Sequence, residues 1–184
     1  MTGARRRAQH SAATEPEIAL RRSTPDDAAG VHRALDAVAR ERRYLGFLEA
    51  PPVESVRAFL SSPGLVQWAA LAGDEIVGWC DVRRSPLEGF RHAGVLGMGL
   101  LPGYRGKGLG RALLLATLQS ARELGLGRIE LEVLESNRAA IALYERHGFE
   151  HEGRKRAGRV LDGAPEDVLC MALLFEAAGG PPPS

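Results

Sequence analysis

The fold of this chain is decided by residues 104–111, which read YRGKGLGR. The apolar run GVLGMGLL at residues 94–101 precedes them and predicts a strand, which Pro102-Gly103 ends. A helical spacing of apolar side chains follows, from about Gly108 to Leu124. Glycines let the backbone approach a ligand closely, and the first N–H groups of a helix lie at the positive end of its dipole. The junction therefore predicts an anion site suited to a phosphate or a pyrophosphate.

Three phosphate-loop templates can be compared with this loop. A P-loop needs Gly-Lys-Ser/Thr at its end, whereas Leu109-Gly110 follows Gly108 here. A dinucleotide fingerprint needs G-x-G-x-x-G, but Gly106 begins a G-x-G-x-G run, and the preceding hairpin does not suit a parallel βαβ core. The template Arg/Gln-x-x-Gly-x-Gly/Ala is met, with Arg105 as its first residue and Gly110 as its last. On the loop alone, a glycine-rich turn without a ligand stays the alternative.

A second motif lies at residues 135–149, which read ESNRAAIALYERHGF. Asn137 and Tyr144 are seven residues apart, so on a helix they share one face and lie roughly 10 Å apart along the axis. An amide at the helix start and a phenol two turns later can contact one elongated ligand. The structural alternative is an N-cap for the asparagine and a packing role for the tyrosine.

Periodicity and turn residues predict seven strands and four helices. The strands are expected at residues 18–22, 65–71, 76–82, 94–101, 129–133, 149–158 and 168–175, and the helices at 24–43, 53–60, 108–124 and 138–147. The order is β-α-α-β-β-β-α-β-α-β-β. Helices interspersed among mostly antiparallel strands indicate an α/β (α+β) protein and exclude a parallel doubly wound sheet.

Length and composition bound the architecture. The chain has 184 residues, which suits one domain, and its 45% apolar and 26% charged content is that of a globular protein. We expect the domain over residues 17–176. Residues 1–16 and 177–184 are polar or rich in Gly and Pro without periodicity, and they are expected to be disordered.

Charge and cysteine usage exclude several function classes. The net charge of +1 gives no electrostatic basis for binding nucleic acid or an anionic membrane, and the longest apolar runs are too short to span a bilayer. Two cysteines cannot build a disulfide framework, and no Cys or His spacing indicates a metal site. The Arg-rich start resembles a transit peptide in composition, but no apolar segment follows it, so the cytoplasm is the expected compartment.

Taken together, the strand at 94–101, the loop at 105–110 and the segment at 137–149 resemble the GCN5-related N-acetyltransferase (GNAT) superfamily. The resemblance covers about residues 17–175. It implies the acyl-CoA N-acyltransferase fold, with a mixed, mostly antiparallel sheet flanked by helices. It also implies that acetyl-CoA donates its acetyl group directly to an amine in a ternary complex. Residues 92–99, 149–153 and 167–171 are similar to the bacterial branch that acetylates free amino acids and similar small amines.

The resemblance also implies roles for individual residues. Tyr144 would donate a proton to the departing thiolate, and Asn137 would hydrogen-bond the pantetheine arm. The backbone of Met98 and Leu100 would pair with the pantetheine arm. The pyrophosphate would be held by the Arg111 side chain and by the backbone N–H groups of Arg105, Gly106, Gly108 and Gly110.

The chain departs from the superfamily at the general base. Many relatives have a glutamate on the strand before the loop, whereas residues 94–97 read GVLG. The candidates for a base acting through water are left unranked; they are Glu49, Asp81, Glu130, Glu132 and His92.

The acceptor pocket is expected from residues 33–58 and 154–167. Six arginines in these segments would suit a carboxylate-bearing acceptor, with a solvated basic surface as the alternative; they are Arg40, Arg42, Arg43, Arg154, Arg156 and Arg159.

The function expected from the sequence is N-acetylation of a small primary amine, such as an amino acid or an analogue. The alternatives are acetylation of a protein N-terminus or lysine, and a non-catalytic regulator that binds acyl-CoA on the same fold. A dinucleotide-dependent oxidoreductase is disfavoured by the glycine spacing. The oligomeric state is open, although the resemblance favours a homodimer.

Overall fold

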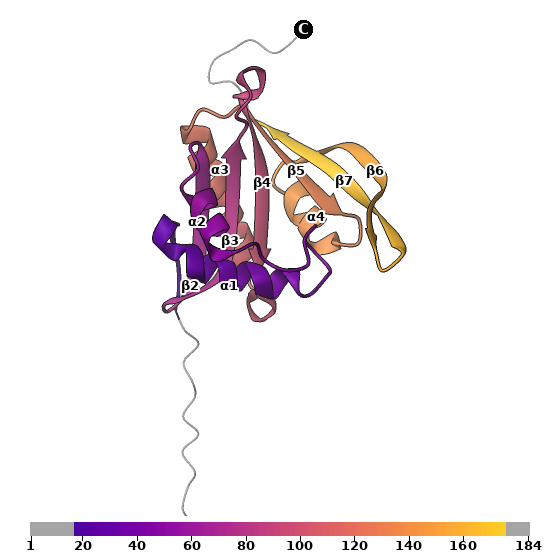
Figure 1. Ribbon diagram of the computed structural model, residues 1–184. Coiled ribbons are helices and arrows are strands. Elements are labelled where there is room, and N and C mark those ends of the chain that lie inside the picture. The colour runs from indigo at the N-terminus through magenta and orange to yellow at the C-terminus, as the bar shows by residue number, and fades with distance from the viewer. Residues whose placement is uncertain (1–16, 176–184) are drawn as a thin grey trace, which may run out of the picture.

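Seven strands form one sheet in the order β1-β2-β3-β4-β5-β7-β6 in the computed structural model, which describes residues 17–175 (Figure 1). The strands are β1 Ile18–Arg22, β2 Leu65–Ala72, β3 Glu75–Arg84, β4 Ala93–Leu100, β5 Arg128–Leu134, β6 Glu150–Leu161 and β7 Ala164–Leu174. The helices of at least eight residues are α1 Ala28–Ala39, α2 Val53–Leu60, α3 Leu109–Glu123 and α4 Arg138–Glu145. The predicted element order and fold class are confirmed, whereas the ends predicted to be disordered lie outside the described residues.

The helices cover the sheet on both faces because each presents an apolar stripe to it. On α1, the buried side chains Val31, Ala34 and Val38 recur at three- and four-residue spacing and pack with α2 against Trp79 of β3. On the other face, α3 and α4 pack on a larger core that includes Leu113. Two hydrophobic clusters therefore lie on opposite sides of one sheet.

The sheet opens between strands β4 and β5. Among the strand pairs only β4 and β5 run parallel, and they pair only from Ala93 to Val95 and from Arg128 to Glu130. Beyond these residues the two strands diverge, as Figure 1 shows. The other edge of β4 is bonded to β3, since the Leu101 N–H donates to the Val77 carbonyl at 2.9 Å.

The backbone of β4 therefore has groups along the gap that no neighbouring strand pairs. Backbone groups of successive residues in a strand point to alternate sides. Leu101 and Ala93 bond toward the β3 side, so the groups of Met98 and Leu100 point into the gap between β4 and β5. These are the two residues whose backbone is expected, from the family resemblance, to pair with the pantetheine arm.

Two predicted helices end earlier than expected. The first was expected to reach Arg43, but α1 ends at Ala39 and the chain turns at Arg42, whose φ is 56°. The last was expected to reach His147, but α4 ends at Glu145, and Gly148 lies beyond it with a φ of 85°. In both places, the left-handed residue that turns the chain lies three residues past the last helical one.

The final hairpin is longer than predicted. Its strands extend to Leu161 and from Ala164, and they are joined by Asp162-Gly163, both at positive φ, as a two-residue hairpin turn requires. The side chains of β6 are almost all exposed, so the segment has no apolar alternation from which to predict a strand.

Candidate active site

The glycine loop lies at the mouth of the gap between β4 and β5. Gly106 has a φ of 73° and Gly108 a φ of 83°, a conformation that side chains disfavour. A Cβ built at either position meets no atom within 4 Å, so the space in front of the loop is open. No side chain caps α3, which begins directly after Gly108. The loop thus has the open approach and the uncapped helix start that a phosphate site needs.

Gly110 and Arg111, at the start of α3, differ in their surroundings. A Cβ at Gly110 would lie 3.3 Å from Leu100 Cδ1, so this glycine allows α3 to pack closely on β4. Arg111 is exposed.

Arg105 holds the loop in place through its side chain. Its guanidinium makes a bidentate ion pair with Glu41, with one bond of 2.8 Å, and donates from Nε to the Leu100 carbonyl at 2.8 Å. The group also lies 4.7 Å from the centroid of the Tyr44 ring. The Arg105 backbone N–H donates to the Pro102 carbonyl at 3.3 Å, within a 3₁₀ turn. The observed role of Arg105 is therefore positioning, and the sequence did not indicate Glu41 as its partner.

Helix α4 begins after Asn137 and carries Tyr144 near its C-terminal end. The Asn137 side chain caps the helix by accepting from the Ala140 N–H at 3.3 Å. Tyr144 is 6% exposed, and its ring centroid lies 5.6 Å from that of Phe149. Its hydroxyl has no hydrogen-bond partner among the described residues. Burial, with a smaller effect of Cys80, raises the pKa of the phenol, so it holds its proton at neutral pH.

A cavity of about 710 Å³ lies on the opposite face of β4. Its walls are mainly apolar side chains from α1, the segment 45–52 and α2. Its sheet side is formed by Gln67, Trp79, Asp81, Gly97 and Met98. Met98 lines this cavity and its backbone groups point into the gap, so this residue borders both.

Asp81 is the one buried group among the five base candidates. It is 9% exposed, and burial raises the pKa of its carboxyl to about 7, although a hydrogen bond with Gln67 and the charge of Arg83 oppose the shift. It lies opposite Gly97 in the sheet register, and a Cβ there would be 3.4 Å from Asp81 Oδ2. The missing side chain at Gly97 thus leaves the carboxylate accessible from the cavity.

The other four candidates lie at more exposed positions. The Glu49 side chain is 75% exposed at the edge of the same cavity. Glu130 pairs with Arg128 at 2.6 Å, Glu132 pairs with Lys155, and His92 is exposed.

The structure explains why β4 has no glutamate at Gly94. A Cβ at this position would lie 2.6 Å from Val82 Cγ1 and 2.9 Å from Leu126 Cδ1. Because both atoms belong to the packed core, a longer side chain has no room there. Because β4 carries no carboxylate, one for this region must come from another element.

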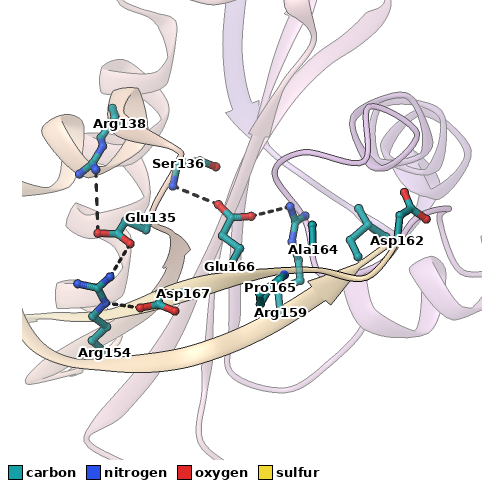
Figure 2. A pocket seen from close by; sticks show the side chains of 11 residues that line it. Glu135, Ser136, Arg138, Arg154, Arg159, Asp162, Ala164, Pro165, Glu166 and Asp167 are labelled. Atoms are coloured by element: carbon teal, nitrogen blue, oxygen red, sulfur yellow. Dashed lines mark hydrogen bonds and ion pairs between the residues drawn. The ribbon is translucent and has the colours of Figure 1, made fainter.

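A charged hollow of about 770 Å³ lies along the β6–β7 hairpin (Figure 2). Arg154 pairs with Glu135 at 2.8 Å and with Asp167, and Arg159 pairs with Glu166 at 2.7 Å (Figure 2). Of the six arginines expected to bind a carboxylate, these two are thus paired within the protein. Arg40 and Arg42 are paired as well, with Asp36 and Asp162 respectively. The other two are exposed: Arg43 lies over the Tyr44 ring, and Arg156 is on β6.

Residues 17–175 contain neither a metal-binding cluster nor a membrane-spanning helix. No group of three or more His, Cys, Asp and Glu side chains there could hold a metal ion. No helix in this range is long and apolar enough to cross a membrane.

Comparison with known proteins gives consistent matches. The model of the acetyltransferase (GNAT) family matches residues 33–149. An uncharacterized N-acetyltransferase of Escherichia coli, YjgM, is 34% identical over 138 residues, which cover 72% of this chain and 81% of that protein. The ribosomal protein bS18-alanine N-acetyltransferase of the same species is 42% identical over 72 residues, covering 39% of this chain and 49% of that protein.

A solved structure shares the fold. It is that of a phosphinothricin acetyltransferase from Sinorhizobium meliloti in complex with acetyl-CoA, with a TM-score of 0.81. It is 21% identical in sequence, and the match covers 90% of this chain and 93% of that one.

Proposed function

The chain belongs to the GNAT family of acetyltransferases, and we propose that it transfers the acetyl group of acetyl-CoA to a small primary amine, such as an amino acid or an amine analogue of one. The observation that carries this proposal is the gap between β4 and β5. It runs from the open glycine loop to Met98, where it meets the cavity that contains Asp81.

The residues along the gap fit acetyl-CoA in order. Gly106 and Gly108 leave space for the pyrophosphate at the start of α3, with Arg111 beside it. Backbone groups of Met98 and Leu100 can pair with the pantetheine arm as an added strand would, although the Leu100 carbonyl already accepts from Arg105. Asn137, at the start of α4, would hydrogen-bond the pantetheine arm in this arrangement.

The bound thioester supplies an activated acetyl group. The protein positions the thioester and the amine and supplies the proton transfers. An amine must lose a proton before it attacks, since an ammonium has no lone pair. As the carbon–sulfur bond breaks, Tyr144 holds a proton that it can deliver to the sulfur. The thiol of the leaving group titrates near the cysteine value of ~8.5, so this assistance is modest in energy.

A protein N-terminus is the second candidate acceptor. It is favoured by the similarity to the bS18-alanine N-acetyltransferase, which covers 39% of this chain. The near-neutral net charge and the largely apolar cavity favour a small amine instead.

Acetyl-CoA is expected to stabilise the fold and NAD is not. At a concentration about 100-fold above its Kd, a ligand adds ~2.7 kcal/mol to the free energy of unfolding. For a domain of this size that is a rise in Tm of roughly 5–10 °C. Thermal melting with each ligand measures the difference. An unchanged Tm with acetyl-CoA, or a larger shift with NAD, would contradict the proposal.

Comparing the acetylation rates of different amines identifies the class of acceptor. Free amino acids, simple amines, polyamines, aminoglycosides and peptide N-termini are assayed with acetyl-CoA by release of thiol. We expect a small amine to exceed the peptides in kcat/KM by at least about tenfold, the size of effect that one pocket contact can produce. Turnover of a protein or peptide substrate alone would favour the second candidate.

A further inference from the structure

The cavity on the α1–α2 face has a polar end with two hydrogen-bond acceptors. One is the carboxylate of Asp81 on β3. The other is Gln67 Oε1 on β2, which is buried and has no hydrogen-bond partner within residues 17–175. A buried carbonyl oxygen without a partner is costly, so this arrangement favours a ligand that brings N–H donors to both groups.

The remainder of the cavity is chemically different. Its wall side chains include Val31, Leu35, Phe47 and Phe59, and its lining contains no Lys, Arg or His. The only other charged group in the lining is Glu49, at the edge. A ligand carboxylate would therefore be desolvated without a cation and would lie near carboxylates of the protein.

We propose that this cavity takes a primary amine with an uncharged, apolar body and no carboxylate, and that Asp81 accepts the proton of its ammonium group. This inference rests on the proposed function and narrows its substrate class to aliphatic or aromatic amines. Gln67 orients the nitrogen, and Gly97 keeps the space in front of the carboxylate open.

Each proton and each bond of the acetyl transfer is accounted for by Asp81, Tyr144, the amine and the thioester. The ammonium gives one proton to Asp81, and the nitrogen lone pair forms a bond to the thioester carbon. The carbon–sulfur bond then breaks and its electron pair leaves on sulfur, which takes a proton from Tyr144. The nitrogen loses its second proton as the amide forms, and that proton replaces the one on Tyr144. The proton on Asp81 passes to water.

The charged and titratable groups around Asp81 are few. Gln67 faces it from β2, Arg83 lies two residues along β3, and Cys80 is its buried neighbour. From the segment before α2, Glu49 lines the cavity edge, whereas α1 and α2 present apolar side chains and Ser55. Burial is the main cause of the raised pKa, so the carboxylate forms only as pH rises through about 7.

Binding is tested first, by thermal melting with 2-phenylethylamine and with L-phenylalanine, which differ only in the carboxylate. We expect 2-phenylethylamine to raise the Tm of the wild type, and L-phenylalanine to have little effect. Asp81→Asn should lose the shift with the amine and keep the shift with acetyl-CoA. Asp74→Asn, the same change in the exposed β2–β3 turn, should keep both. If acetyl-CoA fails to shift the wild type, the proposed function fails. If only the amine fails, this inference fails.

The stability of the free protein gives a readout that needs no ligand. A carboxyl titrates near ~3.9 in an unfolded chain and Asp81 near about 7 in the fold, so folding binds a proton between these values. The wild type should therefore lose Tm relative to Asp81→Asn as pH rises from about 4 to about 7. Equal pH dependence in the two proteins would overturn the assignment of a buried, titrating carboxyl.

Turnover completes the test. We expect 2-phenylethylamine to exceed L-phenylalanine in kcat/KM by at least about tenfold. Asp81→Asn should lower kcat/KM by ~10²–10⁴-fold and remove its rise with pH near 7, as loss of a general base does. Equal use of the two substrates, or a folded Asp81→Asn protein with an unchanged pH profile, would overturn the inference. The inference would also be overturned if Glu49→Gln, and not Asp81→Asn, removed the rise of kcat/KM with pH near 7.

Discussion

Tyr144→Phe is expected to fold and to bind acetyl-CoA as the wild type does, while kcat falls by about 10²-fold, the low end for loss of a general acid. The ring is 6% exposed and packs on Phe149, and phenylalanine preserves both properties. What is lost is the hydroxyl proton, which the raised pKa keeps in place at neutral pH. Steady-state kinetics with a melting curve as the folding control measure the effect.

A packing role for Tyr144 predicts a different result. Phe149→Leu disturbs the same packing without removing a proton donor. It should therefore lower Tm while kcat stays close to the wild-type value. If Tyr144→Phe keeps its kcat when chemistry limits the rate, the residue belongs to the core and not to the chemistry.

Gly108→Val is expected to remove most of the stabilisation by acetyl-CoA and to raise its KM by at least about tenfold, since phosphate contacts contribute charge-assisted hydrogen bonds of ~1.5–3 kcal/mol each. Open space lies in front of Gly108, and a branched side chain would occupy the place of the phosphate. The substitution also strains the backbone, whose φ is 83°, at a cost of about 1–3 kcal/mol.

The strain can be separated from the ligand effect by Gly125→Val. Gly125 follows the other end of α3, has a φ of 80° and is equally open, so valine there costs a similar strain away from the gap. This control should lower the Tm of the free protein but keep the shift with acetyl-CoA. If Gly108→Val keeps the shift as well, the loop does not bind the pyrophosphate.

The sequence was sufficient to predict the framework of the fold. Local signals fix most elements: alternation at residues 129–133, the Gly-Asp turn before β3, and the apolar spacing of α3. The β6–β7 hairpin was predicted too short because β6 is almost entirely exposed and rich in charged residues. Its pairing with β7 stabilises the strand without an apolar pattern.

The site was predictable where it depends on local motifs and not where it depends on packing. The glycines and the Asn137–Tyr144 spacing are visible in the sequence. Asp81 was one of five unranked candidates because its burial arises from helices packed over β3. The partnership of Arg105 with Glu41 joins residues 64 positions apart, and no periodicity indicates it.

Transfer of acetyl from acetyl-CoA to an amine can be measured by mass spectrometry of free CoA and N-acetylated product, with 2-phenylethylamine as acceptor and the amine panel beside it. We expect the two products in equal amounts, formed only when acetyl-CoA and an amine are both present. Binding of acetyl-CoA without acetylation of any amine would contradict the proposed function and indicate a non-catalytic acyl-CoA-binding protein.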